Sequence, residues 1–241
     1  MTHDTNVLGQ PIGRPVPDWQ PPPRPARSPM AGRYCRLESV DPAHHAADLH
    51  AANARDPNGA MWTYLPYGPF PGLKAYQAWL ESVAAGDDPH FLAIVDVASG
   101  TAVGLASYLR IDPANGSIEV GHLAYSPLLQ RTPAATEAMF LMMQWAFASG
   151  YRRYEWKCNA LNAPSRRAAM RLGFSYEGVF RQAGIVKGRN RDTAWYAAID
   201  AEWPALEQAY RDWLAPENFD AGGRQRRSLA SLTAPVLKLR G

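Results

Sequence analysis

The segment from Ile118 to Phe174 constrains the fold more than any other part of the chain. Its strand-like start, Ile118 to Tyr125, passes through a short loop into a long apolar helix that begins near Pro133. Pro133 has the fixed φ of a first helical turn, Thr132 can cap the helix, and Glu137 adds an acid near its start. Such a loop leaves backbone N–H groups unpaired at the positive end of the helix dipole. The segment therefore predicts a seat for a phosphate group.

The rest of the segment repeats the same alternation of strand and helix. The first helix has little polar surface, so we expect it to lie buried against a sheet. A second strand, Tyr154 to Cys158, is followed by the loop from Asn159 to Ser165, a short helix and the sequence Leu172-Gly173-Phe174.

Between Glu119 and Trp195 the chain resembles the GNAT superfamily of acyl-CoA-dependent N-acetyltransferases, and within it the branch of the ribosomal-protein alanine N-acetyltransferases. That superfamily has a loop pattern Gln/Arg-x-x-Gly-x-Gly/Ala, then an Asn after the next strand and a Gly-Phe that closes the next helix. The matching positions here are Gln130, Pro133, Ala135, Asn162 and Gly173-Phe174. The resemblance extends from about Arg36 to about Trp213. It implies an α+β fold with a GNAT-like mixed, mostly antiparallel central sheet flanked by helices.

The resemblance also implies acetyl-CoA as the cosubstrate, and no metal. The backbone N–H groups of Leu123, Ala124 and Tyr125 would bind the pantetheine and the thioester carbonyl. Proline stands at position 133 where a glycine is usual, and it cannot donate a hydrogen bond. We therefore expect an altered phosphate loop rather than a lost one. Its candidate residues are Gln130, Arg131, Thr132, Ala134, Ala135 and Thr136, and Asn162 completes the set for CoA.

The proton donor for the departing CoA thiolate differs from that of the family. The ribosomal alanine acetyltransferases of one subtype place a tyrosine seven residues after the asparagine, and this chain has Ala169 there. Ser165 is the favoured replacement, because it matches a serine of the closer branch that could hydrogen-bond the CoA sulfur. A structural role as a helix cap after Pro164 is the alternative for this serine.

The base is also altered, because Lys157 stands where the same subtype has a glutamate, and a cation cannot accept a proton. Glu119 becomes the leading acid–base candidate, with His122 behind it. Strand alternation places these two side chains on opposite faces unless a bulge intervenes. Holding Arg110 or Arg191 on an adjacent strand is the alternative role for Glu119.

The expected reaction is acetyl transfer to a primary amine, either a protein N-terminus or a small molecule. Removing the proton from an α-amino group at pH 7 costs about 1.4 kcal/mol, against about 4.6 kcal/mol for a lysine side chain. The absence of a second carboxylate therefore leans toward an α-amine or a small-molecule amine. A non-catalytic GNAT-like module that binds another ligand or serves in assembly is the alternative. The glycine motifs of nucleotide-dependent enzymes do not occur.

Composition predicts one folded domain with two extensions. The chain has 241 residues, of which 46% are hydrophobic and 20% charged. We divide it into a Pro-rich arm (1–30), an acetyltransferase-like domain (31–216) and a basic, solvated tail (217–241). The arm would pack on the domain or on a neighbouring subunit, which leaves a homodimer open. A net charge of +3 does not argue for a nucleic-acid partner.

The cysteines and the lack of long apolar runs indicate the cellular compartment in which the protein is expected. Cys35 and Cys158 have no companions that would form a zinc site or a disulfide framework, so we expect two buried free thiols. No run approaches the length of a membrane span and the N-terminus lacks the features of a signal peptide, so a cytoplasmic location is expected.

Periodicity predicts the remaining elements in the order strand, two helices, three antiparallel strands, helix, strand, helix, two strands, helix. The aromatic segment Met61 to Phe70, between the first two helices, is predicted to be a loop that either packs on the core or lines an acceptor pocket.

Overall fold

The computed structural model describes residues 4–241 and contains one large sheet with helices on both faces. Its strands are β3 (Met30–Ala31), β4 (Cys35–Ser39), β5 (His90–Asp96), β6 (Ala102–Asp112), β7 (Ser117–Tyr125), β8 (Arg153–Asn159), β9 (Ser175–Val186) and β10 (Arg189–Ile199). The α-helices are α1 (Pro42–Asn53), α2 (Leu73–Ala84), α3 (Pro133–Ala148), α4 (Ala163–Arg171), α5 (Trp203–Leu214) and α6 (Leu229–Thr233).

The sheet confirms the predicted α+β fold and its mostly antiparallel character. The strand order is β3-β4-β5-β6-β7-β8-β10-β9. Every neighbouring pair is antiparallel except β7 and β8, which run parallel because the helix α3 crosses between them. Both the succession of elements and the phosphate-loop helix therefore agree with the sequence pattern, although α6 and the short strand β3 were not predicted.

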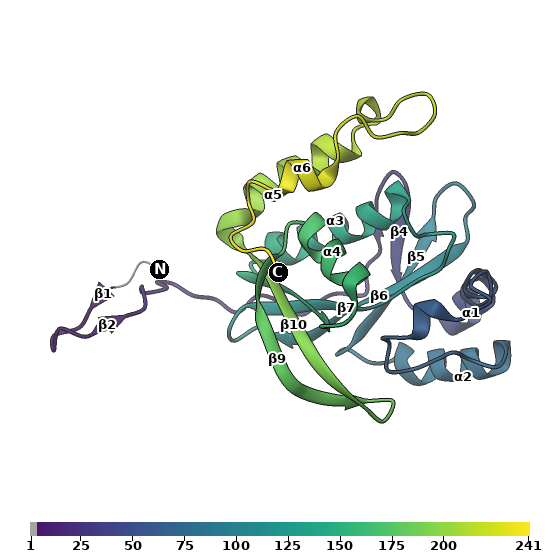
Figure 1. Cartoon of the computed structure of the whole chain (residues 1–241), viewed down its shortest axis with the longest axis horizontal. Helices are drawn as coiled ribbons and strands as arrows, with labels where there is room; N and C mark the ends of the chain where they lie inside the picture. The colour runs from purple at the N-terminus through teal and green to yellow at the C-terminus, as the bar shows by residue number, and fades with distance from the viewer. Residues whose placement is uncertain (1–3) are drawn as a thin grey trace.

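The sheet separates two cores (Figure 1). Helices α3, α4 and α5 cover one face, and α1 and α2 cover the other at the β4–β6 end. Strand β5 shows why both layers are needed, because Leu92 and Ile94 point into the first core and Phe91, Ala93 and Val95 into the second. Because β5 is buried on both faces, its sequence is a continuous apolar run rather than an alternation of apolar and polar residues.

Local sequence signals determine where α3 begins and where α4 ends. The Thr132 hydroxyl accepts a hydrogen bond from the Ala135 N–H, which makes Thr132 the N-cap of α3 as predicted. Gly173 follows α4 with φ of +91°, and a Cβ at this position would lie 2.3 Å from the Leu206 side chain. A glycine is required here because of both the positive φ and the close contact.

Glu137 has a different role from the dipole partner that its position suggests. Its carboxylate, 5% exposed, accepts hydrogen bonds from the backbone N–H groups of Arg33, Tyr34 and Cys35 at 2.8, 2.6 and 2.9 Å. One buried side chain of α3 therefore holds the chain segment that enters β4.

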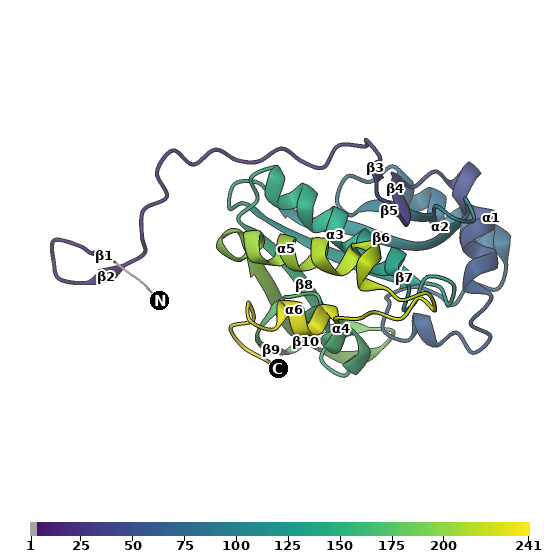
Figure 2. The same cartoon turned by 90° about the horizontal axis from the view of Figure 1, so that it is seen from above.

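The Pro-rich arm lies partly on the domain and partly free of it (Figures 1 and 2). The Trp19 indole donates to the Ala114 carbonyl at 3.0 Å, and the Tyr151 hydroxyl donates to the Pro23 carbonyl at 3.1 Å. Before these contacts the chain extends away from the body and ends in the small hairpin of β1 (Asp4–Thr5) and β2 (Pro11–Ile12).

The C-terminal residues are more ordered against the domain than their charges suggest. Leu229 of α6 is fully buried in the first core, and the Thr233 hydroxyl donates to the Arg171 carbonyl at 3.0 Å. The expectation of a solvated tail is wrong for this helix, because the burial of Leu229 and the hydrogen bond of Thr233 hold it on the domain despite the basic residues around it. Within residues 4–241 no helix is both long and apolar enough to span a membrane.

Candidate active site

The site begins where β7 and β8 separate. The two strands pair only from Ser117 to Val120 on β7 and from Arg153 to Trp156 on β8. Beyond this point β7 stays bonded to β6 and β8 stays bonded to β10, so the sheet opens along its middle. The β7 edge that faces the opening therefore presents unpaired alternate backbone groups over Leu123, Ala124 and Tyr125.

A β-bulge in β7 changes which side chains face this opening. Leu105 pairs with Ala124 and Ser107 pairs with Gly121, so two residues of β7 lie opposite one residue of β6. His122 takes the positive φ of +52° that this extra residue needs. Glu119 and His122 consequently line the same cleft. Regular strand alternation would place Glu119 and His122 on opposite faces of the sheet. The bulge shifts the alternation by one residue, which is the exception allowed for in the sequence analysis, so both side chains face the cleft.

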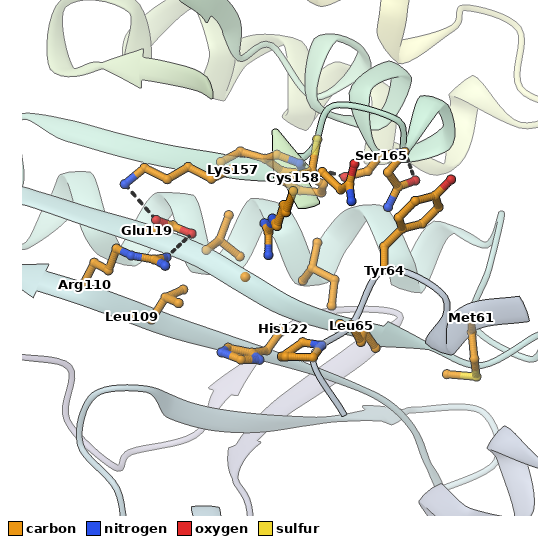
Figure 3. A pocket seen from close by; sticks show the side chains of 18 residues that line it. Met61, Tyr64, Leu65, Leu109, Arg110, Glu119, His122, Lys157, Cys158 and Ser165 are labelled. Carbon is orange, nitrogen blue, oxygen red and sulfur yellow. Dashed lines mark hydrogen bonds and ion pairs between the residues drawn. The ribbon is translucent and has the colours of Figure 1, made fainter. Parts of the chain in front are cut away.

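The cleft has a volume of about 330 Å³ and is lined from both sides of the opening (Figure 3). Figure 3 places Glu119 and Arg110 at one end, Ser165 and Tyr64 at the other, and His122 between the two ends. The aromatic loop after α1 contributes Met61, Tyr64, Leu65 and Pro66. The segment therefore does both things that the sequence left open, because these four residues line a pocket while Trp62 and Phe70 pack in the second core. Whether an acceptor binds in this pocket stays a prediction.

Two hydrogen bonds close the cleft at its rim. The Tyr64 hydroxyl donates to the Leu161 carbonyl at 3.2 Å, which bridges the aromatic loop and the turn before α4. The Lys187 ammonium donates to the Trp62 carbonyl at 2.8 Å, which ties the tip of the β9–β10 hairpin to the same loop. Contacts between segments this far apart in sequence were not predicted.

Glu119 lies in a buried charge network. Its Oε1 accepts a hydrogen bond from the Arg110 guanidinium at 2.8 Å. Its Oε2 forms an ion pair with the Lys157 ammonium at 3.0 Å. Lys157 also contacts Glu155 at 2.6 Å. Burial raises the pKa of Glu119, while Lys157 and Arg110 oppose that rise. The Glu119 carboxylate thus holds Arg110, which is the structural role considered for it, and it also lines the cleft, as its catalytic role requires.

Ser165 and Asn162 lie together at the start of α4. The Asn162 side-chain carbonyl accepts from the Ser165 N–H at 3.1 Å, so Asn162 caps the helix and the capping alternative for the Ser165 hydroxyl is wrong. The Ser165 hydroxyl instead accepts from the Trp156 indole at 3.0 Å. The Ser165 hydroxyl also lies within hydrogen-bonding reach of the Cys158 thiol, and both side chains line the cleft. Ala169 is fully buried within α4.

The predicted phosphate loop is partly open. The Thr132 N–H donates to the Leu129 carbonyl at 3.3 Å, and the Ala135 N–H donates to the Thr132 hydroxyl at 3.2 Å. The amides of Arg131 and Ala134, which precede the first intrahelical bond of α3, have no acceptor within the described part of the chain. Two of the five candidate donors therefore remain available at the N-terminus of α3, while the Thr136 N–H belongs to the helix.

The side chains of this loop are already engaged. The Gln130 amide donates to the Tyr125 carbonyl at 2.7 Å, and the Thr136 hydroxyl accepts from Arg171 at 3.1 Å. Arg131 has φ of +64°, which bends the loop in the absence of a glycine. These residues do not line the cleft, so the phosphate seat and the reaction centre are separate parts of one site.

His122 gives the protein a testable dependence on pH. Burial, with the charges of Arg110 and Arg191, lowers its pKa to about 4. Because an unfolded histidine titrates near pH 6.5, the unfolded chain takes up the proton first, and stability declines as the pH falls from about 6.5 to about 4. The loss is at most about 3.4 kcal/mol, from a pKa difference of roughly 2.5 at 1.36 kcal/mol for each pKa unit.

Denaturant unfolding at pH 7.5 and 4.5 measures this effect. His122→Asn, which tolerates a positive φ, is expected to be less sensitive to pH than the wild type, while the exposed His44→Asn keeps the wild-type dependence. Buried His90, whose pKa burial also lowers, supplies a common background in all three proteins. An identical decline in wild type and His122→Asn would remove His122 as its source.

The chain is similar to known acetyltransferases. A model of the acetyltransferase (GNAT) domain matches residues 36–175. The crystal structure of a GCN5-related N-acetyltransferase from Brucella melitensis is 49% identical, covers 91% of this chain and 100% of that chain, and has a TM-score of 0.89. A probable GNAT-family acetyltransferase from Chromobacterium violaceum ATCC 12472 is 39% identical, with 81% and 98% coverage and a TM-score of 0.76.

A curated relative is more distant. The ribosomal-protein-serine acetyltransferase of Escherichia coli (strain K12) is 29% identical over 97 residues, which are 40% of this chain and 54% of that enzyme. The chain thus matches about half the length of this relative.

Proposed function

This chain belongs to the GNAT acetyltransferase family, as its sequence resemblance indicated, and we propose that it moves an acetyl group from acetyl-CoA to a primary amine. Enzymes of this family use acetyl-CoA as the acetyl donor. The observation that carries the proposal is the separation of β7 and β8 after Val120. It leaves free backbone groups beside a cleft that contains both an acid–base candidate and a proton donor.

The donor would be held along the β7 edge and at the start of α3. The amides of Arg131 and Ala134 supply hydrogen bonds to the pyrophosphate, and the helix dipole adds to them. The N–H groups of β7 near Leu123 to Tyr125 bind the pantetheine and polarise the thioester carbonyl. The Asn162 amide nitrogen remains available to CoA, because only the side-chain oxygen is used in capping α4.

The reaction itself needs few groups. The amine attacks the thioester carbon, so a C–N bond forms and the C–S bond breaks. Glu119 accepts the proton that the amine loses, and Ser165 donates its hydroxyl hydrogen to the departing thiolate. Ser165 then takes a proton from solvent and Glu119 gives its proton to solvent, so both groups end as they began. The bond from the Trp156 indole to the Ser165 oxygen stabilises that oxygen as it loses its proton.

Thermal unfolding with CoA tests this proposal. A ligand at 100 times its dissociation constant stabilises by about 2.7 kcal/mol, which raises Tm by about 5–10 °C for a domain of this size. Asn162→Ala is expected to reduce the shift, and the exposed Asn115→Ala is expected to keep it. Absence of any shift at millimolar CoA, together with no CoA release in the presence of amines, would refute the proposed function.

A further inference from the structure

Arg191 of β10 is a cation of the cleft whose charge is not matched by the protein. It lines the cleft with His122 and Cys158. Within residues 4–241 its side chain takes part in no ion pair and no hydrogen bond, and its Nε is buried without an acceptor. Burying part of a guanidinium without a partner costs free energy, because the group loses water and gains nothing in return.

The carboxylates near the cleft are already paired with other cations. Glu119 contacts Arg110 and Lys157, at 2.8 and 3.0 Å. The network continues through Glu155, which contacts Lys157 at 2.6 Å and Arg153 at 2.6 Å. It ends where Arg153 meets Glu177 at 2.6 Å. These three cations and three carboxylates balance, so Arg191 adds a net positive charge to the lining of the cleft.

The location of Arg191 separates it from the anionic part of the donor. The loop of residues 126–136, where we place the pyrophosphate of CoA, does not line the cleft. Arg191 instead lies with Glu119, His122 and the aromatic loop, which surround the position where the amine would enter. The charge of Arg191 also reaches His122, whose pKa it helps to lower.

We propose that the acceptor amine carries a second, anionic group, a carboxylate or a phosphate, and that Arg191 binds this group. The inference rests on the proposed function and names its substrate class. A guanidinium presents a planar pair of N–H donors that matches either anion. A polyamine would meet Arg110, Lys157 and Arg191 with only Glu119 to attract it, so amino acids and phosphorylated amines suit this cleft better.

Paired acceptors that differ only in the anionic group test the proposal. The pairs are L-phenylalanine and 2-phenylethylamine, L-leucine and 3-methylbutylamine, and phosphoethanolamine and ethanolamine, with spermidine as a reference polyamine. Initial rates of CoA release at saturating acetyl-CoA give kcat and KM for each amine. The first two pairs report on a carboxylate and the third on a phosphate.

The wild type is expected to favour the anionic member of at least one pair by about tenfold or more in kcat/KM, mainly through KM. Arg191→Gln should remove that preference, and Arg191→Lys should restore part of it. The ratio between wild type and variant cancels the different basicities of the paired amines. Arg189→Gln, on the same strand and exposed, is the matched control and should keep the preference.

Three results would overturn the inference. The first is that wild type and Arg191→Gln prefer the anionic amines equally. The second is that only amines without an anionic group are acetylated, and the third is that no anionic amine is acetylated although CoA still raises Tm. If Arg191 were only structural, Arg191→Gln would lower Tm and kcat for all amines alike and leave the ratios unchanged. Loss of both the CoA-dependent Tm shift and all turnover would instead refute the proposed function.

Discussion

Replacing Glu137 with alanine is expected to lower the free energy of unfolding by about 4 kcal/mol or more, a large part of the roughly 5–15 kcal/mol that is typical of a folded protein. The wild-type carboxylate accepts three backbone N–H groups ahead of and within β4. Alanine would leave all three without a partner in a mostly buried position, and each buried unpaired donor costs about 1–3 kcal/mol. The space is also tight, since a Cβ on Gly32 would lie 2.4 Å from the Glu137 carboxyl carbon.

Urea unfolding followed by circular dichroism measures this loss. Glu137→Gln keeps one carbonyl oxygen as an acceptor and is expected to lose less stability than the alanine variant. Glu207→Ala is a surface control, because Glu207 is partly exposed and pairs with Arg211 on the same helix. A Glu137→Ala protein within about 1 kcal/mol of the wild type would show that the three N–H groups find other partners.

Glu119→Gln is expected to lower kcat/KM for the amine by about 100-fold or more. If Glu119 accepts the proton of the attacking amine, the amide of glutamine cannot replace it. The structural cost of the change is smaller than the catalytic one. Lys157 keeps its contact with Glu155, and the Arg110 side chain, 60% exposed, regains contact with water.

Arg110→Gln separates catalysis by Glu119 from its role in holding Arg110. If Glu119 only positions Arg110, both variants should lose activity to the same extent. If Glu119 is the base, Arg110→Gln should retain most of the activity, and Glu119→Gln should also lose the acidic limb of the pH profile of kcat/KM. Equal losses in the two variants, with matching pH profiles, would assign the base to another group.

The sequence predicts the helices and most strands well because local patterns specify them. Thr132 and Pro133 mark the start of α3, and the apolar spacing of α2 defines its buried face. The helix α6 was missed because its five residues give too short a pattern, and its burial depends on contacts with α4 and α5. The role of Glu137 was missed for a similar reason, since its partners lie about a hundred residues away.

The site was predicted in its parts but not in its arrangement. Family motifs pointed to Asn162 and Ser165, which the structure brings together at the start of α4. The bulge at His122 depends on the pairing of β6 and β7, which no local pattern in Gly121-His122-Leu123 specifies. The pocket-lining alternative for the aromatic segment included Tyr64, which does line the cleft. Arg191 was considered as a partner of Glu119, but Glu119 pairs with Arg110 and Lys157, and Arg191 reaches the cleft through tertiary packing that no local pattern specifies.

The apolar character of β5 on both faces also bears on how the protein would misassemble. Phe91 to Val95 is uncharged, free of proline and rich in residues that favour strands, a composition typical of segments that form steric zippers. The layer of α1 and α2 covers one side of it. Because β4 and β6 pair both edges of β5, detachment of these two helices would expose an apolar sheet face and not a strand edge, and association of two copies through that face is the expected form of misassembly.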